Sequence, residues 1–162
     1  MSNKKKALYA GTFDPFTNGH KDIVTRALNV FDEVTILIAV PPSKKPFIAK
    51  DTRLKILKEI FKDEPRVIIE SWGGLIVDYA KEKNIGSIVR GLRPTGDFEI
   101  EFQMASMNRH LNSELDTFFL MTGEDHYYVS STLVREIHSH GGDISKFVDP
   151  IVIECIKEQE KE

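Results

Sequence analysis

The chain has 162 residues, which suits one globular domain because chains divide into separate domains only beyond roughly 250–300 residues. Hydrophobic residues make up 41% of the chain, and 22 basic against 25 acidic residues leave a net charge of −3. This balance excludes the global positive field with which a protein holds nucleic acid or an anionic membrane. We therefore expect a single domain over residues 1–162, with no nucleic-acid partner and no membrane partner.

The sequence shows no pattern typical of a secretion signal or of a membrane-spanning segment. The first six residues are polar and basic, and no apolar segment follows them directly. The longest apolar run, residues 34–40, is too short for a membrane helix. The single cysteine, Cys155, cannot form an internal disulfide. These features together predict a cytoplasmic protein.

From the N-terminus, strand-like apolar runs alternate with helical patterns, which is typical of linked βαβ units. Residues 7–11 and 34–40 are predicted as buried strands, and apolar side chains between them recur at helical spacing. The carboxylate of Asp51 can cap the next helix, which Pro65 ends. Residues 67–70 then form the third predicted strand.

The same alternation continues through the second half of the chain. Residues 74–83 are predicted as the third helix and residues 87–90 as a short fourth strand. Asp97 can cap a long fourth helix, and residues 117–121 form the fifth strand.

Two capped helices complete the pattern. Ser130 can cap a helix that Gly141-Gly142 ends, and Asp149-Pro150 is a cap followed by proline at the first helical position. The fold class predicted from the whole pattern is α/β. We expect a Rossmann-like open five-stranded parallel sheet with helices on both faces and an extra C-terminal helix.

The segment just after the first predicted strand contains residues suited to binding a ligand. Open parallel sheets bind ligands beyond the carboxyl ends of their strands, so residues 11–20 lie where a ligand is expected. They match neither a Walker A loop nor the Rossmann G-x-G-x-x-G pattern. The helix start at Asn18-Gly19 offers free N–H groups to an anion, and His20 can add a hydrogen bond. On spacing alone, a plain turn with a surface histidine is an equal alternative.

Four motifs together resemble a known family. Tyr9–Pro15 running into Thr17-Asn18-Gly19-His20 resembles the T/H-x-G-H signature of the nucleotidyltransferase superfamily, in the form found in the phosphopantetheine adenylyltransferase family. Three further segments follow in the family's order, each after a predicted strand: residues 42–46, 90–93 and 129–135. The resemblance covers nearly the whole chain.

The resemblance implies an activity. Members of the family join ATP and 4′-phosphopantetheine to give dephospho-coenzyme A and pyrophosphate, with Mg²⁺, in the penultimate step of coenzyme A biosynthesis. It also implies a homohexamer, and it assigns no metal ligand to the protein. His138 and His140 do not supply one, because positions i and i+2 diverge on a helix.

The resemblance also implies roles for individual residues. The catalytic set it implies is Thr12, His20, Lys44 and Arg93. The implied contacts to phosphopantetheine are Thr12, Lys44, Leu75, Ile76 and Arg90. The implied contacts to ATP are Thr12, Phe13, His20, Gly91, Leu92, Arg93, Glu101, His126, Tyr127, Tyr128, Val129, Ser130, Ser131 and Thr132.

Several alternatives stay open at this point. Another nucleotidyl transfer on the same scaffold, to nicotinate mononucleotide or from CTP to a polyol phosphate, would preserve the first and last motifs. A nucleotide-binding sensor without turnover is the alternative from another class. Ser130 is an ordinary helix cap in its own right, and Lys44-Lys45 could be a solvated loop. The apolar residues Phe98, Phe102, Met104 and Met107 suit either a core or a subunit contact.

Overall fold

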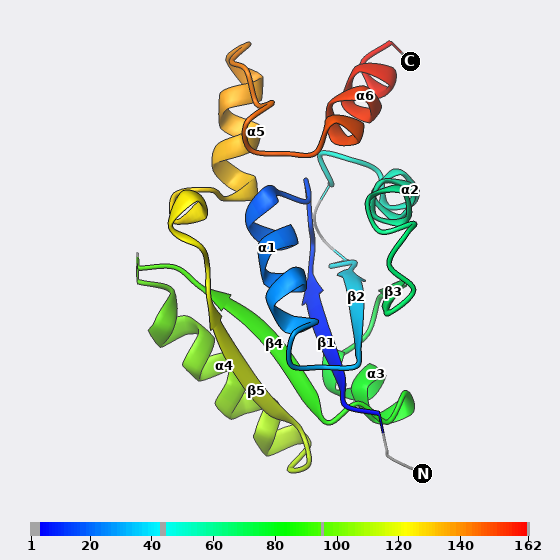
Figure 1. The fold of residues 1–162 in the computed structure, drawn as a ribbon, viewed down its shortest axis with the longest axis vertical. Coiled ribbons are helices and arrows are strands. Elements are labelled where there is room, and N and C mark those ends of the chain that lie inside the picture. The colour runs from blue at the N-terminus through cyan, green and yellow to red at the C-terminus, as the bar shows by residue number, and fades with distance from the viewer. Residues whose placement is uncertain (1–3, 43–44, 95, 162) are drawn as a thin grey trace.

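The computed structural model describes residues 4–42, 45–94 and 96–161. Within them a five-stranded sheet has the order β3-β2-β1-β4-β5, and every neighbouring pair is parallel (Figure 1). The strands are β1 (Lys6–Gly11), β2 (Glu33–Ala39), β3 (Val67–Trp72), β4 (Ser87–Leu92) and β5 (Asp116–Met121). The predicted open parallel sheet is confirmed.

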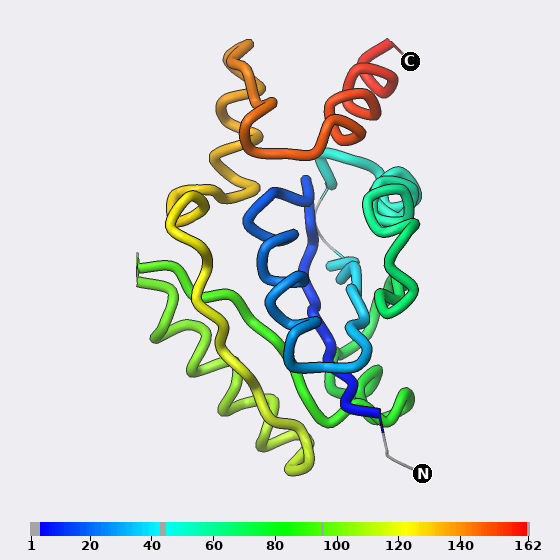
Figure 2. Tube along the Cα trace, viewed as in Figure 1, coloured from blue at the N-terminus to red at the C-terminus, as the bar shows by residue number. Residues whose placement is uncertain are grey.

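Helices follow the strands in the predicted alternation. They are α1 (Asn18–Ala27), α2 (Lys50–Ile60), α3 (Ile76–Glu82), α4 (Asp97–Leu111), α5 (Ser131–Ser139) and α6 (Pro150–Gln159), with a 3₁₀ turn η1 (Glu124–His126) before α5. In Figures 1 and 2 the strands run from the end of the molecule where β1 begins toward the end where α5 and α6 lie. The extra C-terminal helix is therefore present.

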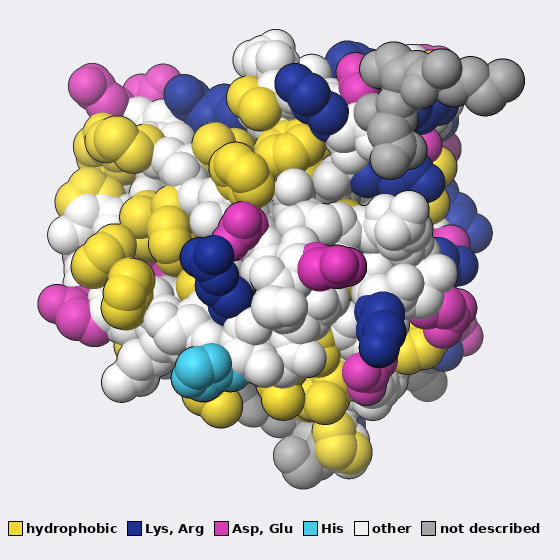
Figure 3. All heavy atoms as spheres, turned by 90° about the horizontal axis from the view of Figure 1, so that it is seen from below, with side chains coloured by type: hydrophobic (Ala, Val, Ile, Leu, Met, Phe, Trp, Pro, Cys, Tyr) yellow, Lys and Arg dark blue, Asp and Glu magenta, His cyan; other side chains and the backbone are white. Residues whose placement is uncertain are grey.

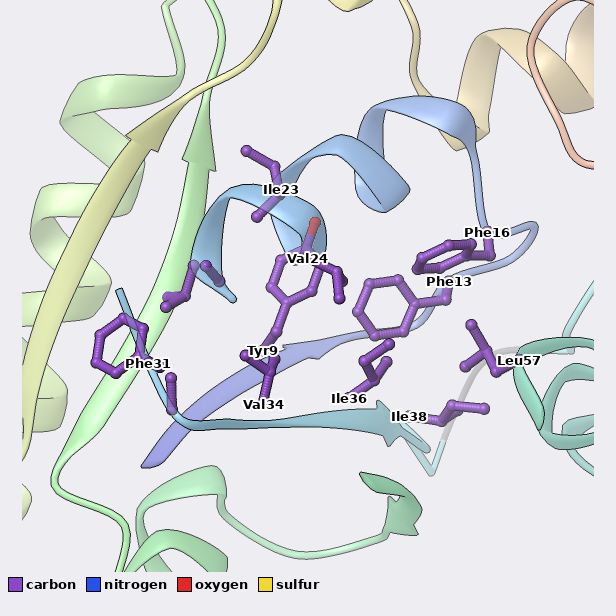
Figure 4. Close-up of a cluster of buried hydrophobic side chains, with 13 residues drawn as sticks. Tyr9, Phe13, Phe16, Ile23, Val24, Phe31, Val34, Ile36, Ile38 and Leu57 are labelled. Atoms are coloured by element: carbon purple, nitrogen blue, oxygen red, sulfur yellow. The ribbon is translucent and has the colours of Figure 1, made fainter. Parts of the chain in front are cut away.

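The central strand β1 separates two cores. Ala7 and Tyr9 point into a cluster formed with α1 and α2, and Leu8 and Ala10 point into a second cluster formed with α3. Successive strand side chains alternate between faces, so a strand covered on both sides is apolar throughout. Figure 4 shows the first cluster, in which Phe13 and Phe16 from the loop after β1 lie close together. Helices therefore cover both faces of the sheet.

A third apolar cluster positions the helices beyond the sheet. Buried side chains of α2, α5 and α6 meet there, among them Ile56, Val134, Val152 and Cys155. The prediction that Cys155 is a buried small hydrophobe is confirmed. Because α5 is packed into this cluster, its N-terminus is held at the carboxyl edge of the sheet.

Two predicted helix caps are wrong. The N-cap of α2 is Ala49, without a side-chain hydrogen bond, and Asp51 lies inside the first turn. The N-cap of α4 is Gly96, whose φ of +78° suits glycine, and Asp97 is the first helical residue. Each carboxylate thus comes too late in the chain to cap, and that of Asp97 instead bonds to Arg93.

The other two predicted caps are confirmed. Oγ of Ser130 accepts the backbone N–H of Leu133 at 3.1 Å, and the carboxylate of Asp149 accepts that of Ile151 at 3.3 Å. Elements also differ slightly at their ends, since β3 and β4 each extend two residues beyond the prediction and α3 begins at Ile76.

The helix α4 buries no residue of its own. Its large apolar side chains are exposed: Phe98, Ile100, Phe102, Met104, Met107 and Leu111. The strand β5 also exposes Met121 and, on the face where Phe118 packs against Phe31, Phe118. Figure 3 shows hydrophobic side chains gathered on the side of the molecule where α4 lies. Of the two alternatives for this set, burial in the core of the chain is therefore wrong.

In the part of the chain that the structure describes, no helix has the length and apolar character to cross a membrane.

Candidate active site at the carboxyl ends of β1 and β4

A cleft of about 280 Å³ opens where the sheet order reverses, between the carboxyl ends of β1 and β4. This is the place at which an open parallel sheet binds its ligand. Most of the predicted site residues line it: Thr12, Phe13, His20, Arg90, Gly91, Arg93, Glu101, His126, Val129, Ser130 and Ser131.

The remaining predicted site residues lie elsewhere. Ile76 lines a small hollow on the other side of Arg90 and Glu101. Leu75 is exposed at the end of the loop after β3, and Leu92, Tyr127, Tyr128 and Thr132 do not line the cleft. Lys44, predicted as catalytic, lies outside the described residues.

His20 is oriented by the start of its own helix. Thr17 is the N-cap of α1, and a capping box links its side chain and backbone to His20. The backbone N–H of Thr17 donates to Nδ1 of His20 at 2.9 Å. A nitrogen that accepts this bond carries no proton, so the proton of the neutral ring is on Nε2. His20 therefore presents an N–H donor from the first turn of α1.

The surroundings of His20 keep its ring neutral. The ring packs against Tyr9, Phe13 and Phe16, with ring centroids 5.1 to 6.3 Å apart. Burial lowers the pKa of His20 to about 3, and the positive charges of Arg90 and Arg93 act in the same direction. At neutral pH this histidine can donate a hydrogen bond, but it is a very weak base.

Arg90 is held by a carboxylate from α4. Its Nε and Nη2 donate to the two oxygens of Glu101 at 2.8 and 2.7 Å, and its Nη1 donates to the carbonyl of Ala10 at 2.6 Å. Burial acts to lower the pKa of Arg90, but the hydrogen bonds and charge of Glu101 outweigh it and raise that pKa overall. The pair ties β4, β1 and α4 together at the floor of the cleft.

Arg93 also forms hydrogen bonds that connect separate segments around the cleft. Its Nε and Nη2 donate to the carboxylate of Asp97 at 2.9 and 3.1 Å, and its Nη1 donates to the carbonyl of Val129 at 3.4 Å. One side chain therefore links the end of β4, the start of α4 and the turn that leads into α5. Arg90 and Arg93 both line the cleft.

The N-terminus of α5 faces the same cleft. Ser130 caps the helix, and Oγ of Ser131 donates to the carbonyl of Pro15 at 2.7 Å, so the helix start is tied to the loop after β1. Opposite it, Gly91 leaves room for α1, because a Cβ there would lie 3.0 Å from Cγ1 of Ile23. Free N–H groups of a helix start and a nearby arginine together favour an anion.

Sequence reasoning missed the support beneath Thr12. Arg53 of α2 is buried, and its Nη1 donates to the carbonyl of Thr12 at 2.5 Å. On the same loop the carboxylate of Asp14 accepts the backbone N–H groups of Phe47 and Ile48 at 2.7 and 2.8 Å. The available signal was a charged residue directly beside the apolar stripe of α2, which is unusual unless the charge has a partner inside.

The cleft offers few ligands to a metal ion. Among residues 4–42, 45–94 and 96–161 no three His, Cys, Asp or Glu side chains are grouped to hold one. The two cleft carboxylates, Asp97 and Glu101, are each bonded to an arginine.

Comparison with known proteins agrees with this geometry. The model of a family described as Cytidylyltransferase-like matches residues 8–137. A protein of Ralstonia pickettii (strain 12J) named phosphopantetheine adenylyltransferase is 47% identical over 153 residues, covering 94% of this chain and 92% of that protein. Proteins of the same name from Anaeromyxobacter dehalogenans (strain 2CP-C) and Thiobacillus denitrificans (strain ATCC 25259 / T1) are 44% and 41% identical, over 94% and 96% of this chain and 93% and 98% of their own lengths.

Proposed function

The chain belongs to the phosphopantetheine adenylyltransferase family of nucleotidyltransferases, and we propose that its cleft transfers the adenylyl group of ATP to 4′-phosphopantetheine. A phosphate oxygen of phosphopantetheine forms a bond to the α-phosphorus of ATP. The bond from that phosphorus to the oxygen bridging to the β-phosphate breaks, and this oxygen leaves with the pyrophosphate. Dephospho-coenzyme A is the other product, and no covalent intermediate on the protein is needed.

The observation that carries the proposal is the neutral, oriented ring of His20. The attacking phosphate is already ionised near neutral pH, so the reaction has no proton whose removal by a base would help. It needs alignment of two anions and donors aimed at the oxygens where charge builds up. A histidine whose Nδ1 is occupied by Thr17 and whose Nε2 carries the proton is such a donor.

The other cleft residues suit binding roles. We assign the β- and γ-phosphates to Arg93 and to the start of α5 at Ser130-Ser131, because an arginine and free helix N–H groups converge there. Arg90, beside the hollow that Ile76 lines, suits the pantetheine side. Lys44 stays a prediction as the cation that acts on the reacting phosphates.

Mg²⁺ is part of the proposal as a partner of the nucleotide. The protein groups do not form a dedicated cage for it, since Asp97 and Glu101 are bonded to arginines. Mg²⁺ commonly keeps several waters and binds through substrate phosphates. We therefore expect the ion to enter on the phosphates of ATP, and we derive no step from it.

The proposal extends to the oligomeric state of the protein and to its location in the cell. The exposed apolar side chains of α4 and β5 support assembly with other copies of the chain, for which we propose the homohexamer. The buried Cys155, the single cysteine of the chain, suits a reducing compartment, for which we propose the cytoplasm.

One assay tests the reaction against its alternatives. The protein is mixed with Mg²⁺, ATP and 4′-phosphopantetheine, and pyrophosphate release is followed. The same assay is run with CTP in place of ATP and with nicotinate mononucleotide in place of phosphopantetheine. We expect release that depends on both ATP and phosphopantetheine. Release only with CTP or only with nicotinate mononucleotide would refute the proposed substrates, and binding of ATP with no release in any arm would favour a nucleotide sensor.

A further inference from the structure

A second hollow, of about 380 Å³, lies beside the cleft. It is enclosed by the loop after β1, the described part of the loop after β2, the start of α2 and the side chain of Arg135 from α5. Among the residues that the structure describes, Thr12 alone lines both the hollow and the cleft. The two spaces are therefore neighbours on either side of Thr12, with otherwise separate walls.

The side chains around this hollow are strongly positive. Lys45, Lys50, Arg53 and Arg135 line it, and Asp14 is the acidic residue among its described lining. Nζ of Lys50 lies 3.7 Å from a carboxylate oxygen of Asp51, which is 89% exposed at its side chain, so solvent weakens that pair. Both carboxylate oxygens of Asp14 accept backbone N–H groups, which offsets part of its negative charge. Four cations from three segments of the chain thus face one space in a protein whose net charge is −3.

Arg53 is the member of this group that most needs an explanation. It is 4% exposed, and its Nη1 donates to the carbonyl of Thr12. Its Nε is buried and finds no hydrogen-bond partner among the residues described. Guanidinium groups stay charged in proteins and carry five N–H donors. The charge of Asp14 acts on this guanidinium, but it leaves the buried Nε–H without an acceptor, which is costly unless a bound anion supplies one.

Arg135 reaches the same place from the opposite wall. Its Nη1 donates to the carbonyl of Asp14 at 2.6 Å and its Nη2 donates to Oγ1 of Thr132 at 3.3 Å. Both acceptors are neutral, so neither cancels the charge of this arginine. Lys45 and Lys50 complete the ring of positive charge at the exposed rim.

We propose that this hollow is a second phosphoryl-anion site, which binds a phosphate or pyrophosphate group next to the reacting centre. Arginine and lysine donors together suit a phosphoryl group better than a carboxylate as the bound anion, because a phosphoryl group offers more acceptor oxygens to the several donors. Two sources could supply the anion: free pyrophosphate or phosphate after release, or the phosphate carried by the pantetheine substrate. That pairing of sources rests on the proposed function, whereas the binding of the anion does not.

The test measures binding without turnover. The cleft is first saturated with α,β-methylene-ATP, and inorganic phosphate and pyrophosphate are then titrated by calorimetry. We expect one anion to bind per chain. A double variant at the rim, Lys45→Glu with Lys50→Glu, should weaken this binding by about tenfold or more, because charge-assisted contacts are lost. The matched control, Lys58→Glu with Lys81→Glu, makes the same change in net charge at exposed positions away from the hollow and should change binding by less than about twofold.

Arg53 is tested separately. Arg53→Lys keeps the positive charge but removes the planar guanidinium. It should weaken anion binding more than the Lys58→Glu with Lys81→Glu control does. Because Arg53 is buried, the thermal unfolding of the Arg53→Lys variant is measured as well. If that variant does not fold, the rim variants decide the outcome.

Competition identifies the source of the anion. Displacement of inorganic phosphate by 4′-phosphopantetheine but not by pantetheine assigns the site to the substrate phosphate. Tight pyrophosphate binding that phosphopantetheine does not displace assigns it to the product.

The overturning results are equally definite. Absence of binding in the analogue-saturated protein, equal binding by the rim variant and its control, or equal binding of acetate would each refute the phosphoryl site. Pyrophosphate release in the standard assay together with no anion binding would remove this site and leave the proposed reaction intact. Anion binding without any release would do the reverse.

Discussion

At the scale of single residues, one interaction joins helix formation to chemistry. The N–H of Thr17 that bonds Nδ1 of His20 belongs to the capping box that begins α1. The same bond decides which nitrogen of the ring carries the proton. Aromatic neighbours and two arginines then keep the ring neutral. The helix start therefore delivers a donor of one defined geometry and charge state.

This reasoning predicts the kinetics of His20 variants. Removing one preorganised donor from a developing oxyanion typically costs on the order of 10²–10³ in kcat, so His20→Ala should fall in that range. His20→Asn should recover part of the rate, because an amide can donate but does not take up a proton at neutral pH. Steady-state kinetics with ATP and phosphopantetheine check this. If Asn is as inactive as Ala while both variants bind ATP and melt like the parent, proton transfer by His20 must be reconsidered.

The lowered pKa of His20 also predicts how stability depends on pH. In the unfolded chain the ring titrates near 6.5, whereas in the folded protein its pKa is about 3. As pH falls below 6.5 the unfolded state takes up a proton that the folded state does not, so the free energy of unfolding decreases. Between pH 7 and pH 5 this contribution amounts to about 2 kcal/mol, at about 1.4 kcal/mol per pH unit below 6.5.

Denaturant unfolding of the parent and of His20→Asn at several pH values measures this effect. The parent should lose more stability than the variant as pH decreases, because Asn does not titrate. Parallel curves for the two proteins over this range would contradict the lowered pKa.

At the scale of elements, α5 and α6 both begin with a side-chain N-cap, but the two caps have different roles. Each has a side-chain cap, Ser130 and Asp149 respectively, but only the start of α5 lines the cleft. The cap at α6 stabilises the helix, and its carboxylate also accepts a hydrogen bond from Nζ of Lys21 in α1 at 3.2 Å. The cap at α5 instead shapes a set of N–H groups that face the proposed nucleotide phosphates.

The two caps form a matched pair of variants. Ser130→Ala and Asp149→Ala should each lower the free energy of unfolding by about 1 kcal/mol, the usual cost of losing a cap. Asp149→Ala also loses the part-exposed ion pair with Lys21, which adds at most about 1 kcal/mol. Only Ser130→Ala should raise the KM for ATP, because only that cap lies in the cleft. Unfolding curves and steady-state kinetics together provide the check. A comparable rise in KM for Asp149→Ala would mean that loosening at the end of the sheet, and not the local site, sets nucleotide affinity.

At the scale of the whole molecule, the sheet order decides where chemistry occurs. Because β1 is flanked by β2 on one side and β4 on the other, the loops that follow β1 and β4 diverge to opposite sides and leave the cleft between them. The outer helix α4 reaches this cleft through Asp97 and Glu101, while its apolar side chains face away from the chain's own core. The same helix thus touches both the site and the proposed subunit contact.

This arrangement predicts a selective effect on assembly. Phe102→Glu places a charge on the exposed apolar surface of α4 and should shift the protein from the proposed hexamer to smaller species. Val30→Glu is the control, because Val30 is 55% exposed and Phe102 is 56% exposed, but Val30 lies in the turn after α1. Light scattering coupled to size-exclusion chromatography measures the mass of each variant. Equal masses for both variants and the parent would contradict the proposed role of α4 in assembly.

The sequence alone determined the alternation of strands and helices, the four motifs and the family that they resemble. These are local signals, since apolar periodicity, a cap at Ser130 and the spacing of Thr17 to His20 depend on neighbours a few positions apart. The same local reasoning failed at Asp51 and Asp97, where the helices begin two residues and one residue earlier than predicted, after Ala49 and Gly96 as N-caps.

Tertiary structure alone decided which partners the charged groups have. The bidentate bonds of Arg90 to Glu101, the bond of Arg93 to the carbonyl of Val129, and the buried Arg53 beneath Thr12 join segments whose distance in space no periodicity encodes. The neutral state of His20 likewise depends on burial and on the two arginines, which strand β4 brings beside α1 only in the folded sheet. Local pattern determines which elements form, and long-range packing determines the electrostatic environment in which their side chains act.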